Sequence, residues 1–168
     1  MIEAPEALYL SEQLNQTIKG KRITDVITRH TPHKFTFYYG DSEKYASLLL
    51  NKKVDKAHSL GGMIEINITN TCLVFTDGAN LRYYGPGEKL PNKHQLLIGF
   101  EDQSCIIVSI RMYGRILCFP ANSFEGNLSD YYNSAKTKPQ VMSDDFSKTY
   151  FMELINQKSL KRKALKLF

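Results

Sequence analysis

The sequence predicts an α+β domain, in which a two-sheet antiparallel β-sandwich carries an N-terminal helix and a short C-terminal helical segment. Three observations predict this class. Apolar residues recur at helical spacing near the start of the chain, short alternating runs fill residues 53–119, and a second helical pattern follows a polar stretch. With 168 residues, of which 42% are hydrophobic, the chain can bury one good core.

The first helix is expected over residues 5–19. Pro5 and Glu6 are typical of a first helical turn, and Gly20 is a natural residue to end the helix. The apolar positions at helical spacing are Ala7, Leu10, Leu14 and Ile18.

Strands are expected to follow. Alternation over 22–29 and the run KFTFYY (34–39) predict two strands, and Asp41 can cap a short helix that carries Tyr45. Turn signals at Asp77-Gly78 and at 85–87 separate later runs, which are MIEINI, LVF, LRYY, LLIGF, CIIVSI and RILCF. Six or more strands without long helices between them favour an antiparallel sandwich or barrel.

The last third of the chain is expected to leave the sheet. Residues 122–142 are rich in Asn, Ser and Pro and indicate a linker, and Ser143 can start a helical segment. The predicted organisation is therefore a sandwich domain over 1–121, a linker over 122–142 and a truncated helical segment over 143–168.

The composition limits the cellular environments and the binding partners that we expect for this protein. The three cysteines are scattered without a CxxC pair, so we expect buried thiols in a reducing, cytoplasmic protein, with neither a metal site nor a cofactor. No apolar run is long enough to cross a membrane. Of 22 basic residues, five lie in 158–168, which contain no acid, so the rest of the chain is formally neutral. A basic patch for nucleic acid must therefore come from an uneven distribution of charged residues in the rest of the chain, or from residues 158–168.

Two carboxylates stand at the start of the chain. Glu3 and Glu6 close to a free α-amine could belong to an active site, and they could equally stabilise the first turn of a helix through its dipole. The residues alone leave both interpretations open.

The order of the short motifs resembles the Fpg/Nei family of formamidopyrimidine-DNA glycosylases and endonuclease VIII. Glu3, Pro5 and Glu6 match the start of that family, and GKRI (20–23) matches its exit from the first helix. LVFTDGANLRYY, KHQLLIGFEDQ and RMYG resemble its intercalation loop, its Lys-His strand start and its Arg-Arg-Phe-Gly motif. The match runs over about residues 1–120, and the final SDDFSKTYFMELINQKSLKRKALKLF resembles entry into the family's helix–two-turn–helix segment.

The resemblance implies DNA repair by base excision. In the family an N-terminal proline amine attacks C1′ of a damaged nucleotide, a neighbouring glutamate transfers protons, and β-elimination cuts the strand as an AP lyase. An α-amine suits this chemistry because its reference pKa, near 8, lies well below that of lysine. The resemblance assigns Glu3, Glu6 and the Met1 amine as catalytic groups, conditional on activity. It assigns Lys93, His94, Arg111 and Tyr113 to DNA binding. In the family the pair that corresponds to Arg111 and Tyr113 lies on a strand-to-strand turn, and Gly114 permits the tight turn that this position requires. Arg111 is therefore expected to be exposed, on the same face of the domain as Glu3 and His94.

Several positions depart from the family pattern. Ile2 replaces the nucleophilic proline, and because isoleucine hinders removal of the initiator methionine, the free amine is expected on Met1. Gly62 replaces a family lysine, Ala79 is too small to fill a vacated base position, and Met112 replaces the second arginine.

The leading hypothesis is a glycosylase-like protein that recognises damaged or abasic duplex DNA weakly, with excision and lyase chemistry weak or lost. The alternatives are a non-catalytic scaffold that keeps the fold, and a fragment of a longer active enzyme. Structural roles compete at single residues as well: His94 at a strand start is also typical of an ordinary surface residue, and Arg111 on a strand is also typical of a cross-strand partner.

Overall fold

The computed structural model describes residues 2–126 and 128–156. Its helices are α1 (Ala4–Thr17), α2 (Tyr45–Leu49), α3 (Ser129–Thr137) and α4 (Lys148–Asn156), with a 3₁₀ turn η1 (Ser42–Lys44) before α2. Its strands are β1 (Ile23–Thr28), β2 (Thr36–Tyr38), β3 (Val54–Leu60), β4 (Met63–Ile68), β5 (Thr71–Tyr84), β6 (Leu96–Phe100) and β7 (Cys105–Pro120). The predicted α+β class, with its N-terminal helix and short C-terminal helices, is confirmed.

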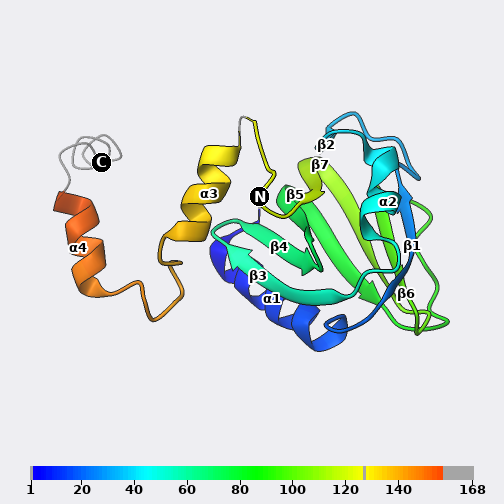
Figure 1. The fold of residues 1–168 in the computed structure, drawn as a ribbon, viewed down its shortest axis with the longest axis horizontal. Helices are drawn as coiled ribbons and strands as arrows, with labels where there is room; N and C mark the ends of the chain where they lie inside the picture. The colour runs from blue at the N-terminus through cyan, green and yellow to red at the C-terminus, as the bar shows by residue number, and fades with distance from the viewer. Residues whose placement is uncertain (1, 127, 157–168) are drawn as a thin grey trace.

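The strands form one hydrogen-bonded sheet of seven strands in the order β1-β6-β7-β5-β4-β3, with β2 alongside β7. Every pairing is antiparallel except that of β2 with β7, which is parallel. Figure 1 shows α1 along one side of the sheet and α2 beside β1, with α3 and α4 displaced to the opposite end.

Two strands are much longer than the sequence predicts. LVF and LRYY belong to one strand, β5, and CIIVSI and RILCF belong to one strand, β7. The expected turn at Asp77-Gly78 is a bulge, because β5 and β7 pair with each other on both sides of it and neither chain reverses. The expected two sheets are thus two halves of one bent sheet, joined by its long strands.

The bent sheet closes at one end. The Gly20 amide donates to the Val54 carbonyl over 2.8 Å, the Val54 amide donates to the Lys21 carbonyl over 3.0 Å, and Arg22 forms a bridge with Lys53. These bonds join the segment before β1 to the start of β3, so the two outermost strands meet again. The main core fills the enclosed space and takes residues from both ends of the sheet, including Ile23 and Ala57.

Helix α1 covers the open edge of β3. The Asn15 side chain donates to the Ala57 carbonyl over 2.9 Å and accepts from the Ala57 amide over 2.7 Å. An amide side chain thereby satisfies a backbone pair that an edge strand would otherwise expose. Ala7 and Leu14 bury the apolar face of the helix, as their spacing predicts.

The predicted linker over 122–142 contains helix α3, which docks on the outer face of the sheet. Tyr132 is buried there against Phe119 and donates a hydrogen bond to the buried Glu65 carboxylate. The Lys136 ammonium lies 3.3 Å from the same carboxylate. Burial and the Glu65 hydrogen bond both raise the pKa of Tyr132, so the phenol stays protonated as the donor. The stretch is therefore structured, although its composition is that of a linker.

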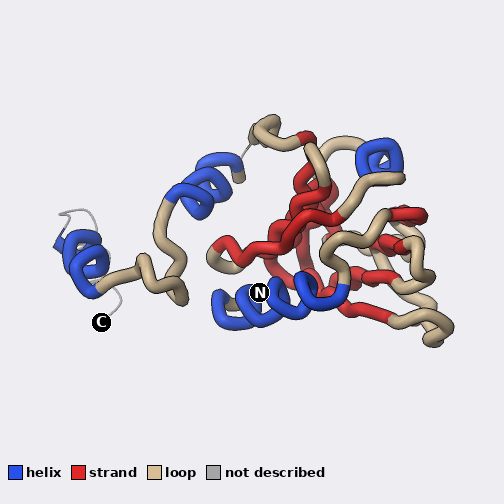
Figure 2. Tube along the Cα trace, turned by 60° about the horizontal axis from the view of Figure 1, so that its bottom comes forward, coloured by secondary structure: helices blue, strands red, loops and turns tan. Residues whose placement is uncertain are grey.

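Helix α4 forms within the predicted C-terminal segment and buries none of its residues. Figures 1 and 2 both show it apart from the sheet. Residues 157–168, which contain the basic tail and the end of the predicted helical segment, lie outside the described residues. No helix among residues 2–126 and 128–156 is long and apolar enough to cross a membrane.

The three cysteines, Cys72, Cys105 and Cys118, are free and buried in strands, as predicted. Burial raises the pKa of Cys118 to about 12, and it raises the pKa values of Cys72 and Cys105. These thiols therefore act as small apolar core residues rather than nucleophiles.

A salt bridge beside the sheet closure generates an acid-dependent prediction. Lys21 Nζ lies 2.6 Å from Asp102 Oδ2, and hydrogen bonds from Lys21 and Ser104 lower the pKa of Asp102 to about 2. A carboxyl whose folded pKa is lowered stabilises the fold above its unfolded pKa, about 4, and loses that contribution as the pH falls through its folded value. Asp102→Asn should therefore destabilise the protein near neutral pH, and this deficit should shrink as the pH falls from about 4 towards 2.

Urea unfolding at a series of pH values measures this difference. Asp55→Asn, at an exposed position of β3, is the control and should show a small difference at every pH. A deficit for Asp102→Asn that stays constant down to about pH 2 would contradict the assignment.

Candidate functional site

The chain start is built into the fold. Ile2 is 3% exposed and belongs to the main core, which explains an apolar β-branched residue at this position. Glu3 is the N-cap of α1, and its amide donates to Glu6 Oε2 over 3.4 Å. Both carboxylates are exposed and sit where a helix dipole favours negative charge. Met1, the expected amine donor, lies outside the described residues.

Gly62, which stands in place of the family lysine, is packed against the backbone of Ile2. A Cβ atom at Gly62 would lie 2.7 Å from the Ile2 carbonyl oxygen, closer than real contacts allow. The space that a side chain would need is therefore occupied by the first residues of the chain. The departures at positions 2 and 62 are parts of one packing arrangement.

A bulge in the long strand pair presents three consecutive side chains to solvent. Asp77 pairs with Gly114 and Ala79 pairs with Ile110, so one β5 residue, Gly78, faces residues 111–113 of β7. Those residues are Arg111, Met112 and Tyr113, and all three are exposed. The expected position on a strand-to-strand turn is wrong, because β7 continues through the bulge.

The backbones of β5 and β7 approach each other so closely at the bulge that glycine is favoured at two positions. A Cβ atom at Gly78 would lie 2.6 Å from the Tyr113 carbonyl oxygen, and one at Gly114 would lie 2.8 Å from Ile110 Cδ1. Gly114 is buried and has no positive φ, so its role is to admit its neighbours rather than to form the expected tight turn. The glycines thus allow the two paired strands to approach closely at the bulge, where residues 111–113 are exposed.

The bulge and the chain start share one cavity of about 310 Å³. Ile2, Glu6 and Leu10 line one side, and Arg111 and Tyr113 line the other together with the β5 bulge. The structure therefore brings together Glu6, Arg111 and Tyr113, which the sequence predicted as site residues from positions more than 100 residues apart.

Three cations surround a second cavity of about 220 Å³ on the neighbouring surface. They are Arg82, Lys93 and Arg111, and all three are exposed. No acidic residue lines this cavity within the described part of the chain, and none of the three cations forms a salt bridge with a described residue. We call these three residues the cation face.

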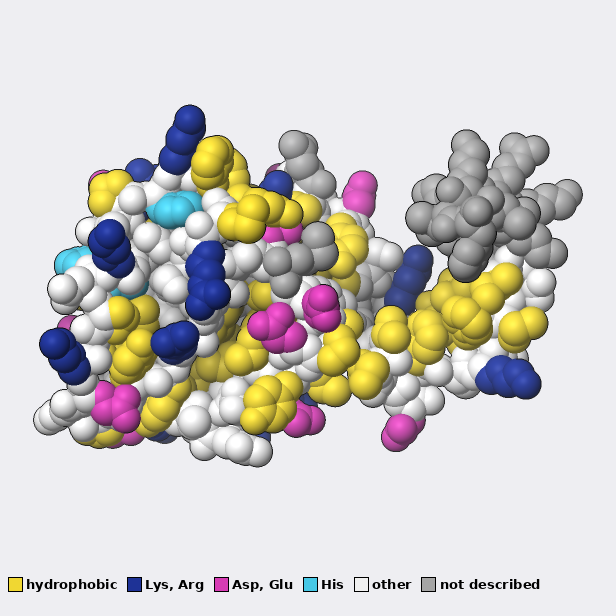
Figure 3. Space-filling view, turned by 180° about the vertical axis from the view of Figure 1, so that it is seen from behind, with side chains coloured by type: hydrophobic (Ala, Val, Ile, Leu, Met, Phe, Trp, Pro, Cys, Tyr) yellow, Lys and Arg dark blue, Asp and Glu magenta, His cyan; other side chains and the backbone are white. Residues whose placement is uncertain are grey.

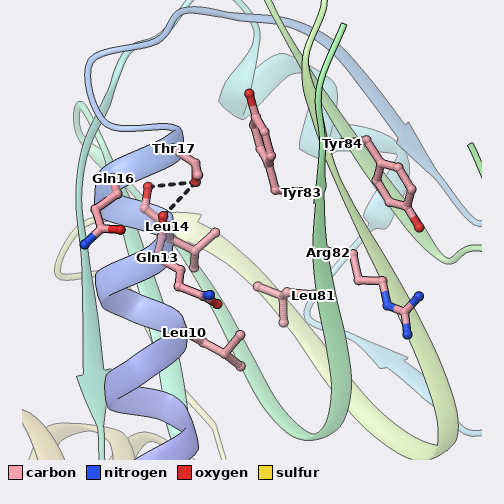
Figure 4. A pocket seen from close by; sticks show the side chains of 9 residues that line it. All are labelled: Leu10, Gln13, Leu14, Gln16, Thr17, Leu81, Arg82, Tyr83 and Tyr84. Atoms are coloured by element: carbon pink, nitrogen blue, oxygen red, sulfur yellow. Dashed lines mark hydrogen bonds between the residues drawn. The ribbon is translucent and has the colours of Figure 1, made fainter. Parts of the chain in front are cut away.

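Arg82 was missed by the sequence interpretation. Figure 4 shows Leu81 and Tyr83 pointing from β5 towards α1, where they help to line a cavity of about 560 Å³, and Arg82 and Tyr84 pointing away from the helix. Strand alternation in LRYY was the available signal, because it places an arginine on the face opposite the buried Leu81.

His94 does not reach the surface as expected. It is 5% exposed, and its ring stacks on His30 with centroids 4.3 Å apart. Burial lowers the pKa of His94, so the neutral ring is favoured, and Nδ1 lies 3.3 Å from the Pro91 carbonyl oxygen. His94 therefore offers no exposed side chain beside Arg111, whereas the neighbouring Lys93 is exposed.

No group of three or more metal-ligating side chains occurs among residues 2–126 and 128–156.

The packing at Gly62 generates a stability prediction. Gly62→Ala should destabilise the protein by about 1–3 kcal/mol, because the added methyl group must push the Ile2 backbone out of place. Chemical denaturation measures the change in the free energy of unfolding. Gly85→Ala is the matched control, since its added Cβ would meet only Glu88 at 3.6 Å. Equal stabilities for the two variants would mean that the first residues move aside and that a side chain fits at position 62.

Comparison with known proteins identifies the fold. No protein-family model matches the sequence, and no curated protein sequence matches it. Among solved structures, Lactococcus lactis Fpg in complex with abasic-site DNA matches with a TM-score of 0.69 and 18% identity, over 90% of this chain and 55% of that chain. The same protein with a FAPY-dG DNA matches with a TM-score of 0.68, 19% identity and coverages of 90% and 55%.

A third structure, MutM in complex with carbocyclic 8-oxo-G DNA, matches with a TM-score of 0.63 and 17% identity, over 79% of this chain and 48% of that chain. This chain therefore has the fold of the N-terminal part of Fpg, as the resemblance predicts. It spans about half the length of the structures it matches.

Proposed function

We propose that this chain is a DNA-repair domain that recognises damaged or abasic duplex DNA, with base-excision and AP-lyase chemistry weak or lost. The observation that carries the proposal is the bulge with its exposed Arg111, Met112 and Tyr113, which adjoins the cation face. The matched Fpg structures contain abasic or damaged DNA, which supports the same class of ligand.

The two parts of the surface suit two different tasks. Arg82 and Lys93 form no salt bridge with a described residue, and their positive charge suits phosphate contacts that position a duplex without reading its sequence. Arg111 and Tyr113 project from the bulge, and wedges of this kind stabilise DNA in which one nucleotide has left the stack. A cation and an aromatic ring can then occupy the space beside a missing base.

The groups for covalent chemistry are less complete. Ile2 is held in the core, Gly62 leaves no room for a lysine, and Glu3 and Glu6 already stabilise the first turn of α1. Glu6 does line the cavity beside Arg111, so a proton-transfer role for Glu3 and Glu6 with a Met1 amine remains the conditional part of the proposal. Misplacing a nucleophile by about 1 Å is enough to lose orders of magnitude in rate.

A non-catalytic scaffold is the second candidate. The packing of Ile2 against Gly62 favours it, because these two residues stand in place of the nucleophilic proline and the lysine of the family and leave no room for a lysine side chain. A part of a longer enzyme is the third, since the chain spans about half of the matched structures. Three free buried cysteines support a reducing, cytoplasmic location.

Binding to a defined abasic duplex tests the recognition surface. Arg82→Ala and Lys93→Ala should each reduce the salt dependence of binding, lowering the slope of log K against log salt by about 0.9 per lost phosphate contact. Arg111→Ala should reduce the preference for abasic over intact duplex. Thermal stability should change by less than about 0.5 kcal/mol in all three, because exposed side chains are removed.

Lys56→Ala supplies the matched control. It removes the same charge from an exposed position of β3, the strand at the far edge of the sheet from β1. If Lys56→Ala weakens binding as much as the cation-face variants do, attraction to DNA is diffuse and the proposed surface is wrong. If Arg111→Ala lowers stability strongly and leaves binding unchanged, Arg111 is a structural residue.

Borohydride trapping on an abasic duplex tests the chemistry. Because Ile2 replaces the nucleophilic proline, the covalent adduct should be very weak or undetectable beside a proline-bearing Fpg enzyme assayed in parallel. Mass spectrometry of the intact N-terminus identifies the residue that bears the free amine. A strong adduct that disappears when the Met1 amine is acetylated would make Met1 the nucleophile and the chain an active lyase.

A further inference from the structure

The segment at β2 exposes two phenylalanines. Phe37 lies in β2 and Phe35 in the turn directly before it, and their side chains are 48% and 47% exposed. Single exposed apolar residues are ordinary at a protein surface, but adjacent large ones indicate a contact surface.

The backbone that carries these rings lies beside the end of the bulge. β2 runs parallel to β7, with Thr36 beside Gly114, and the Gly114 amide donates to the Phe35 carbonyl over 3.0 Å. The Phe35 backbone is therefore hydrogen-bonded to the residue that follows Tyr113. Met112 and Tyr113 are 74% and 45% exposed. We call Phe35, Phe37, Met112 and Tyr113 the apolar platform.

Positive charge lies over the rings of this platform. The Lys34 ammonium is 5.5 Å from the centre of the Phe35 ring, and the Arg115 guanidinium is 5.9 Å from the centre of the Phe37 ring. Arg115 also lies 3.7 Å from Asp77, which offsets part of its charge. Figure 3 shows hydrophobic side chains at the surface beside Lys or Arg and histidine side chains, at the end of the molecule where β2 lies.

A cationic cavity of about 560 Å³ lies next to the platform, lined in part by Arg29, His33 and Lys34. The described residues that line it include no carboxylate. His33 Nδ1 and Thr36 Oγ1, two buried polar atoms of this wall, make no hydrogen bond with a described residue. Polar groups of this kind, together with two cations, suit the backbone phosphates of a strand that crosses the platform.

We propose that the apolar platform binds unpaired nucleobases of single-stranded DNA, which stack on Phe35 and Phe37 while Arg29 and Lys34 meet the phosphates. Aromatic rings interleaved with positive charge are the arrangement that binds single strands. Bases inside a duplex have both faces covered and cannot stack in this way. An apolar protein partner would leave Lys34 without an anion among the described residues, so the charge favours nucleic acid.

This inference rests on the proposed function, because it assigns to the same DNA ligand a second point of contact. The bulge would engage the position of the missing base, and β2 would hold neighbouring bases that have left their pairs. Opening of the duplex near a lesion would then be stabilised by the protein surface.

Fluorescence anisotropy with a labelled oligothymidine single strand tests the platform. The Phe35→Ala/Phe37→Ala variant should bind the single strand about tenfold or more weakly, since each stacked base contributes about 1–3 kcal/mol. Phe37→Tyr keeps an aromatic ring and should retain single-strand binding. Tyr9→Ala removes a 62% exposed ring from α1 and should leave it unchanged. Thermal midpoints show whether each variant stays folded.

The outcomes separate this inference from the proposed function. Undiminished single-strand binding by the double variant would overturn the platform, while loss of abasic preference in Arg111→Ala would still support duplex recognition. A failure of both tests would overturn both. If the unaltered chain ignores the single strand but self-associates in sedimentation, and the double variant does not, the platform is an interface between copies and the inference is wrong.

Discussion

The close approach of β5 and β7 at Gly78 and Gly114 is the constraint on which the rest of the structure depends. A Cβ atom at Gly78 would lie 2.6 Å from the Tyr113 carbonyl oxygen of the opposing strand, and one at Gly114 would lie 3.2 Å from the Ala79 amide nitrogen. This close approach lets both strands continue past the bulge and run through two halves of the sheet, which enclose one core. The same bulge leaves residues 111–113 without partners in β5. One steric requirement therefore shapes the hydrophobic core and exposes the side chains that we assign to recognition.

Charge is distributed by the fold rather than by composition. The chain outside residues 158–168 is formally neutral, yet several acidic residues are engaged in structure: Asp102 with Lys21, Glu65 with Tyr132 and Lys136, and Glu6 in the first turn of α1. Arg82, Lys93 and Arg111 remain without such partners among the described residues. A neutral body can thus present a local positive field. Contacts within the fold decide which charges are left for a ligand.

Local patterns could predict the elements but not their pairing. The spacing of Ala7 and Leu14 gave helix α1 correctly, since periodicity alone determines its buried face. The merging of LVF with LRYY could not be predicted, because an Asp-Gly pair is equally suited to a turn and to a bulge until the opposing strand is known. His94 was misplaced for the same reason: its burial depends on His30, more than 60 residues away. The co-linear motifs predicted Arg111 and Tyr113 at one site. Arg82 could be assigned to that surface only once the orientation of its strand was known.

The closure of the sheet has a consequence for how the chain acquires its shape during synthesis. β1 emerges early from the ribosome, but its partner β6 is some 70 residues downstream, and β6 in turn needs β7. Non-local pairings of this kind carry a large loop-closure entropy and slow folding. Until β7 has been made, β5 is paired only with β4 and β6 only with β1, so the two halves of the sheet are not joined and their apolar faces stay open to wrong association. The nascent protein is thus most vulnerable to aggregation before the last strand of the sheet is complete.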